Sequence, residues 1–167
     1  IFDKLKKKTK NIYGTELFLF DFAIGNISEK KILHETLDSL SSTIKEINEE
    51  SKYYKRKKFI LSGFAKKNFF QEKMIWVKNF KEILQENKIE NIDLLKIDTE
   101  GYEFDVLNGI ADYISKVKMI TFEHHYDNML IKNYKFNDIH NLLVKKKFKS
   151  VYKTKMFFRK SFEYIYV

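Results

Sequence analysis

Residues 92–109 read IDLLKIDTEGYEFDVLNG, and this stretch decides which fold the chain predicts. Its apolar run, residues 92–97, carries four large aliphatic side chains and is bounded by charged residues. Such a run is typical of a strand that is buried on both faces of a parallel sheet. The run ends at four residues that favour a turn: Asp98, Thr99, Glu100 and Gly101. The stretch therefore predicts an α/β protein with two carboxylates at the carboxyl end of a buried strand.

The carboxylates at the end of this strand have two interpretations. In open α/β sheets ligands bind at the carboxyl ends of the strands, so Asp98 and Glu100 before a glycine indicate a site. Asp or Thr after a strand is also a common helix cap, and Glu100 and Glu103 would favour the positive end of a following helix in any protein. Both interpretations stay open from these residues alone.

The rest of the chain predicts strands and helices in alternation, within a single domain over residues 1–167. Strands are expected at residues 16–23, 31–34, 74–77, 118–123, 149–155 and 162–167. Helices are expected at residues 80–88, at residues 104–114, and from a cap at Asn137 or Asp138 to residue 147. Gly109 either ends the second helix or marks a close contact within it. The last two strands indicate an antiparallel pair that closes the sheet.

One segment, residues 38–71, fits this alternation less well than the others. It is polar and shows no regular period over its full length. We therefore expect a loop or insertion there. Within it, residues 44–54 predict a short helix and residues 57–61 predict part of an edge strand.

The composition excludes several classes of protein. With 44% hydrophobic and 16% aromatic residues among 167, the chain is not expected to be disordered and can bury one core. It has no cysteine, so neither a disulfide nor a thiolate metal site can form, which fits a reducing compartment. No apolar stretch approaches the roughly 18 to 20 residues of a membrane span. We therefore expect a cytoplasmic protein without a transmembrane segment.

The formal charge of +9 raises the question of a nucleic-acid partner. Nearly all the basic residues are scattered lysines, and the only arginines are Arg56 and Arg159. Recognition of bases and phosphates favours the bidentate fork of arginine. We therefore do not expect nucleic acid as the primary partner, although the charge favours acidic substrates or surfaces.

The stretch that decides the fold also resembles the FkbM-type family of S-adenosylmethionine-dependent methyltransferases. The family pattern runs isoleucine-aspartate-leucine-leucine-lysine-isoleucine-aspartate, any residue, glutamate-glycine, any residue, glutamate, and residues 92–103 match it. Further similarity extends to Gly109 and covers four other segments: residues 120–124 (ITFEH), 18–25 (FLFDFAIG), 40–43 (LSST) and 76–89. In the last segment, residues 78–80 (KNF) replace the family's usual threonine, leucine and aspartate.

This resemblance implies a class I methyltransferase fold, which is a Rossmann-like, mostly parallel sheet with an antiparallel C-terminal hairpin. The family's first strand with its glycine-rich turn, and its second strand ending in an acid, have no counterpart here. Residues 1–10 resemble the helix that follows that second strand. We therefore expect the chain to be the C-terminal part of the domain, to lack an N-terminal βαβ unit, and to bind the cofactor poorly by itself.

The resemblance also implies a function. It implies S-adenosylmethionine as the cofactor and a hydroxyl of a sugar, a lipid-linked glycan or a secondary metabolite as the methyl acceptor. It places Asp21, Phe22 and Ala23 near the adenine, and Asp98 is a further candidate for binding the cofactor. Two alternatives stay open: a noncatalytic α/β interaction module whose basic surface binds an acidic partner, and a degenerate methyltransferase half that binds no cofactor.

The candidate catalytic residues lie at the ends of two neighbouring strands. One strand ends in Asp98 and Glu100 and the next in Glu123, His124 and His125, and adjacent parallel strands lie about 4.8 Å apart. Methyl transfer to a hydroxyl needs an aligned acceptor and a group that takes its proton. A histidine with a near-neutral pKa suits that role, and clustered carboxylates raise one another's pKa. Glu100, Glu123 and His124 are therefore the candidate bases, and the sequence alone does not select one of them.

Lys96 is a further candidate catalytic residue, because a charge inside a buried strand is costly unless it is paired. Its ammonium either pairs with a neighbouring carboxylate or extends to the edge of the sheet. A metal site made of Asp98, Glu100, Glu123 and a histidine would offer the oxygen ligands that Mg²⁺ or Ca²⁺ prefers. These residues lack the spacing of a dedicated metal motif, so no metal is expected.

Overall fold

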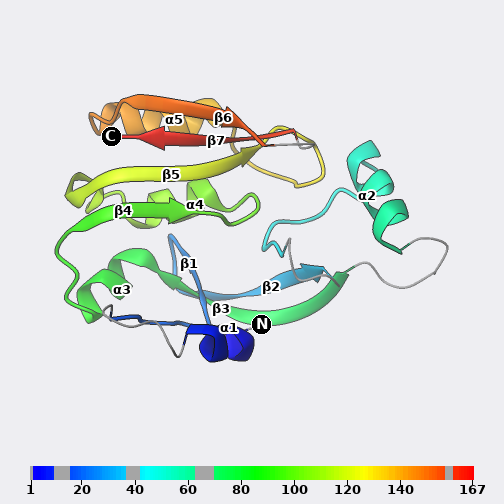
Figure 1. Cartoon of the computed structure of the whole chain (residues 1–167), viewed down its shortest axis with the longest axis horizontal. Helices are drawn as coiled ribbons and strands as arrows, with labels where there is room; N and C mark the ends of the chain where they lie inside the picture. The colour runs from blue at the N-terminus through cyan, green and yellow to red at the C-terminus, as the bar shows by residue number, and fades with distance from the viewer. Residues whose placement is uncertain (1, 10–15, 37–41, 63–69, 157–159) are drawn as a thin grey trace.

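The computed structural model describes residues 2–9, 16–36, 42–62, 70–156 and 160–167. Its helices are α1 (Phe2–Thr9), α2 (Lys52–Ser62), α3 (Phe80–Glu86), α4 (Glu103–Gly109) and α5 (Phe136–Lys145), with a 3₁₀ helix η1 (Ile114–Lys116). Its strands are β1 (Ala23–Gly25), β2 (Glu29–Thr36), β3 (Phe70–Asn79), β4 (Ile92–Ile97), β5 (Val117–His125), β6 (Ser150–Lys155) and β7 (Ser161–Tyr166). The strands form two sheets (Figure 1), so the fold is mixed α/β. None of the described helices is both long and apolar enough to span a membrane.

The larger sheet contains the stretch that decides the fold. Its strand order is β4-β5-β7-β6. β4 and β5 are parallel, with Ile97 opposite Phe122, whereas β7 is antiparallel to both β5 and β6. The predicted neighbouring parallel strands and the predicted C-terminal antiparallel pair are both confirmed.

The smaller sheet has the order β1-β3-β2, with β1 parallel and β2 antiparallel to β3. The strand predicted at residues 16–23 is misplaced, because strand pairing begins only at Ala23. The apolar run before it leaves Phe18 and Phe20 65% and 43% exposed, so it does not enter the core. In the described residues two separate sheets replace the single, mostly parallel sheet that was expected.

Helix α4 joins the two sheets. A Cβ atom on Gly109, the last residue of α4, would lie 2.1 Å from the carbonyl oxygen of Gly25 in β1, so only a glycine allows this contact. Leu107 is fully buried in the core that both sheets share. Both expectations for Gly109 hold, since the helix ends there and the two backbones touch. The helix is shorter than the predicted residues 104–114.

The described helices that pack against the larger sheet lie on one of its faces. Helices α4 and α5 lie on one side of it (Figure 1), and their apolar residues share a core with Ile97 and Phe122. Side chains alternate along a strand, so Leu94 and Met119 lie on the opposite face, where they are 54% and 37% exposed. The prediction that residues 92–97 are buried on both faces is therefore wrong. Aliphatic residues on both sides of a strand do not reveal which face a helix covers.

The segment expected to be a loop or insertion forms an irregular strap, residues 42–51, followed by α2. The Oγ of Ser51 accepts a hydrogen bond from the backbone N–H of Tyr54 at 3.1 Å, which caps the first turn of α2. The helix predicted at residues 44–54 therefore begins later, and the strand predicted at residues 57–61 is wrong because α2 runs through it. Residues 38–41 and 63–69, which include half of the LSST segment, lie outside the described residues.

Candidate active site

A tight turn after β4 brings Glu100 to the end of β5. Glu100 and Gly101 have φ values of 48° and 100°, in the left-handed region that glycine tolerates and other residues rarely adopt. The turn places Oε2 of Glu100 3.0 Å from Nε2 of His125. The ends of the two parallel strands are therefore in direct contact, as their order in the sequence predicted.

His125 lies among three carboxylates, and we name this group the histidine–acid cluster: Glu100, Glu123, His125 and Asp127. Nε2 of His125 is 3.0 Å from Glu100 and 3.5 Å from Glu123, and Nδ1 is 3.7 Å from Asp127. The four side chains are nearly buried, between 4% and 12% exposed. Burial lowers the pKa of His125, but Asp127, Glu100 and Glu123 outweigh this effect and raise it to about 9. The imidazole is therefore positively charged at neutral pH.

Asp127 and Lys132 extend the cluster, and neither was among the residues predicted from the sequence. Burial raises the pKa of Asp127, but its hydrogen bonds with His125 and the backbone of Met129 outweigh this and lower it. Lys132 donates to the carbonyl oxygen of His125, and burial lowers the pKa of its ammonium. An aspartate two residues beyond a pair of histidines was the available signal, because this spacing keeps it near the same strand end.

The buried carboxylate of Glu103 stabilises the turn after β4. It is fully buried, and its Oε1 accepts hydrogen bonds from the backbone N–H of Gly101 at 2.6 Å and from Oγ1 of Thr99 at 3.3 Å. Its Oε2 is in contact with the hydroxyl of Tyr134. Burial, followed by the charge of Glu103, raises the pKa of Tyr134, so this hydroxyl remains a donor. These contacts fix the backbone conformation that presents the Glu100 carboxylate.

The structure distinguishes the two interpretations of the acids after β4, which were a ligand site and a helix cap. The residue that caps α4 is Tyr102, and no side chain makes a capping hydrogen bond there. Neither Asp98 nor Thr99 therefore acts as the helix cap. Glu103 lies in the first turn of α4 and serves the local structure, whereas Glu100 faces the end of the neighbouring strand.

His124 points away from the acids, because successive residues of β5 face opposite sides of the sheet. It is 3% exposed and lies against Tyr126 and Phe136, with ring centroids 4.8 and 5.8 Å away. Burial, followed by the charges of Lys132 and His125, lowers the pKa of His124 to about 3, so its imidazole is neutral. Neither histidine therefore has the near-neutral pKa that would suit a general base.

Lys96 and Asp98, the other two predicted catalytic residues, are both exposed. Lys96 is opposite Thr121 in the sheet, on the open face, so the expectation of a buried lysine is wrong. Asp98 lies at the same edge as the histidine–acid cluster but outside its ion pairs. Within the described residues, no group of three or more acids and histidines is arranged to hold a metal ion.

The residues predicted to bind the adenine lie in the other sheet. Ala23 begins β1, and Asp21 and Phe22 form the bend before it. The ammonium of Lys78 lies 4.6 Å from the centroid of the Phe22 ring. The structure therefore brings Glu100 and Glu123 together and places Asp21, Phe22 and Ala23 in a separate layer; their role in binding a cofactor stays a prediction.

The strap, residues 42–51, anchors the turn that carries Glu100. Oγ1 of Thr43 donates to the carbonyl oxygen of Glu100 at 2.7 Å. The ammonium of Lys45 forms an ion pair with Asp105 of α4, also at 2.7 Å. The sequence did not predict these contacts, because a polar segment without a regular period carries no signal for what it packs against. This segment is therefore part of the site's framework.

The fold and this edge of the larger sheet define an α/β protein with an acid-rich site where two parallel strands end. The family model of the FkbM methyltransferase domain matches residues 6–150, so the chain belongs to the FkbM methyltransferase family. The resemblance carried by residues 92–103 is therefore confirmed. No curated protein and no solved structure matches the chain.

Proposed function

We propose that this protein is an S-adenosylmethionine-dependent methyltransferase that transfers the methyl group to a hydroxyl of a sugar, a glycan or a secondary metabolite. The observation that carries the proposal is the buried histidine–acid cluster where β4 and β5 end, inside the segment that matches the family. We also propose that the protein's strands belong to a sheet of the class I methyltransferase type. The proposal also includes a contribution of Asp21, Phe22, Ala23 and Asp98 to cofactor binding.

The residues at this edge fit a cofactor that carries positive charge. The cluster combines three carboxylates with one imidazolium, and Asp98 adds an exposed carboxylate beside it. When bound, S-adenosylmethionine supplies an electrophilic methyl group on a sulfonium. An acidic, partly buried edge favours a sulfonium over an anionic ligand.

The chain's own residues provide for the proton that a hydroxyl acceptor loses. The imidazolium of His125 lies within 3.5 Å of both Glu100 and Glu123. Either carboxylate can therefore accept the proton, and His125 orients both. His124, with a pKa of about 3, is too weak a base for this role and lies on the other face.

A binding and turnover experiment tests this proposal. Because residues 1–167 alone are expected to bind the cofactor poorly and to be inactive, the experiment uses the full-length protein, in which we expect calorimetry to detect S-adenosylmethionine binding and labelled methyl groups to reach a hydroxylated acceptor. Glu100→Gln should reduce turnover by about 100-fold, because it removes a charge next to the reacting groups. Glu86→Gln is the matched control, since Glu86 is exposed at the end of α3 and should leave turnover unchanged. Equal turnover in the two variants would remove Glu100 from the mechanism, and absence of cofactor binding would leave the noncatalytic module as the function.

A further inference from the structure

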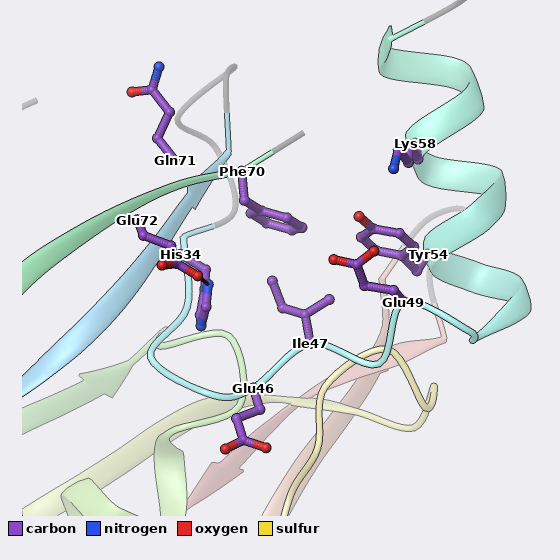
Figure 2. Close-up of a pocket in the computed structure, with 9 residues that line it drawn as sticks. All are labelled: His34, Glu46, Ile47, Glu49, Tyr54, Lys58, Phe70, Gln71 and Glu72. Atoms are coloured by element: carbon purple, nitrogen blue, oxygen red, sulfur yellow. Dashed lines mark ion pairs between the residues drawn. The ribbon is translucent and has the colours of Figure 1, made fainter. Parts of the chain in front are cut away.

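A second concave surface lies beside the strap. It is a groove of about 1030 Å³ between the strap, α2 and the strands β2 and β3, and we name it the aromatic–acid groove. Its lining residues are His34, Glu46, Ile47, Glu49, Tyr54, Lys58, Phe70, Gln71 and Glu72 (Figure 2). Strands β2, β4 and β5 all end on the side of the molecule where α2 lies (Figure 1), so the groove and the histidine–acid cluster share that side.

Aromatic rings form the apolar part of the groove. The rings of Phe70 and Tyr54 stack with centroids 6.1 Å apart and an interplanar angle of 14°. Tyr54 is 4% exposed, and Ile47 packs against the same small cluster. Figure 2 shows Phe70 between His34 on one side and Tyr54 on the other. The groove therefore has a preformed apolar wall.

Carboxylates surround this surface. Glu49 lies next to the Tyr54 hydroxyl and Glu72 next to His34 (Figure 2), with Oε1 of Glu72 3.7 Å from Nδ1 of His34. Burial, followed by the charge of Glu49, raises the pKa of Tyr54. Three glutamates and one lysine line the groove, so it carries negative charge on a chain whose total is +9. Phosphate or carboxylate ligands are disfavoured there.

The chain itself already places a cation in this groove. The ammonium of Lys58 lies 5.5 Å from the centroid of the Tyr54 ring. A cation over an aromatic face is attracted by the ring's quadrupole, and nearby carboxylates add to that attraction. The position of Lys58 therefore indicates that the groove stabilises an ammonium group. The ammonium of a ligand would compete with Lys58 for this position.

We propose that the aromatic–acid groove binds a protonated amine carried on a small hydroxylated ring, and that this amine-bearing sugar is the methyl acceptor. The acceptor role rests on the proposed function, whereas the binding itself does not. The strap connects the two places, because Glu49 lines the groove and Thr43 donates to the carbonyl oxygen of Glu100. The strap therefore borders the groove and also anchors the turn that carries Glu100.

Protein NMR of the chain without cofactor tests the binding. We expect D-glucosamine, at a pH below the pKa of its amine, to shift the resonances of Tyr54 and Phe70 in a saturable way. D-glucose should bind more weakly and glucose 6-phosphate weakest of the three. A stronger response to the phosphate than to the amine would overturn the proposal.

Variants sharpen this test, because opposite charges should act in opposite directions. Glu49→Gln should weaken glucosamine binding about threefold or more, and Lys58→Gln should strengthen it, since a competing ammonium is gone. Glu50→Gln is the matched control: it changes the same charge on the same strap, but Glu50 lies outside the groove and pairs with Lys55. Weaker binding in Lys58→Gln, or equal losses in Glu49→Gln and Glu50→Gln, would contradict a site for amines in this groove.

A methylation assay with the same ligands separates the two proposals. Methyl transfer to glucosamine that Glu49→Gln slows would support both. Groove binding without methyl transfer to the amine sugar would retain the groove and overturn its role as the acceptor site. Methyl transfer to a neutral sugar, together with no amine binding at Tyr54 and Phe70, would retain the proposed function and overturn the groove.

Discussion

His125 contributes a positive charge to the acid-rich candidate site. A histidine in the unfolded chain has a pKa of about 6.5, whereas three nearby carboxylates raise the pKa of His125 to about 9. Its neighbour His124 changes in the opposite direction, to about 3, because it is buried among aromatic rings and next to cations. Two consecutive residues therefore make opposite contributions to the pH dependence of stability.

The two pKa shifts predict a maximum in the free energy of unfolding as a function of pH. The contribution of His125 is fully present below about pH 6.5 and is lost as the pH rises through about 9, because the folded state holds the proton more tightly. The contribution of His124 is lost as the pH falls below about 6.5. We expect the free energy of unfolding to be greatest near pH 6.5 and to fall by on the order of 2 kcal/mol towards pH 9.

Urea unfolding across this pH range measures the effect. His125→Gln should remove the alkaline decrease, whereas His34→Gln, on β2, should retain it. An alkaline decrease of equal size in both variants would assign it to other groups.

The sequence contained the information that separates the two histidines. Glu123 and His125 are two residues apart in β5, so strand alternation places them on one face and His124 on the other. The intrinsic pKa of histidine is the same for His124 and His125, so only this alternation distinguishes them. The left-handed φ of Glu100 and the buried carboxylate of Glu103 left no comparable pattern, because both depend on contacts made after folding.

Among the elements, the strap (residues 42–51) has a structural role that a single hydroxyl can test. Thr43 is 2% exposed; its Oγ1 donates to the carbonyl oxygen of Glu100 and accepts from the backbone N–H of Lys45. Thr43→Val keeps the shape of the side chain and leaves both groups without this partner. We expect a loss of about 1 to 3 kcal/mol in the free energy of unfolding.

Thr43→Ser is the control for this change, because it retains the hydroxyl. Denaturant unfolding should rank the proteins in the order wild type, serine variant, valine variant. Hydrogen exchange should show faster exchange in the turn after β4 for the valine variant alone. Unchanged stability in Thr43→Val would show that the strap does not hold the turn.

Elements whose apolar residues repeat regularly in the sequence were predicted more accurately than the others. The helix predicted from Phe80 agrees closely with α3, and the strands around β4, β5, β6 and β7 were all expected where they occur. Their apolar residues repeat at the period of a helix or a strand and pack into one core. The basic run in α2 has no such repeat, and Phe59 and Ile60, which favour a strand by propensity, are exposed on that helix.

At the scale of the whole molecule, the contact between Gly109 and Gly25 decides how the two sheets are joined. In an ordinary helix Gly→Ala stabilises by about 1 kcal/mol. Here the new Cβ atom would lie 2.1 Å from a backbone oxygen of β1, and backbone cannot rotate away as a side chain can. We therefore expect Gly109→Ala to destabilise the protein by about 2 kcal/mol or more.

Thermal unfolding and hydrogen exchange check this expectation together. The alanine variant should unfold at a lower temperature, and exchange should increase first in β1, β2 and β3, which this contact ties to α4. A higher melting temperature would mean that the two backbones are not in contact.

The exposed position of Lys96 in the edge strand β4 bears on how this strand could pair with another chain. Within the described part of the chain β4 pairs on one side only, and it presents Leu94 next to Met119 to solvent. An edge strand with exposed aliphatic residues is a template for pairing with another copy and for aggregation. A charged lysine in that strand opposes such pairing, since a second copy would bring like charges together and bury them. The position of Lys96 in β4 therefore disfavours the pairing of this strand with a second copy.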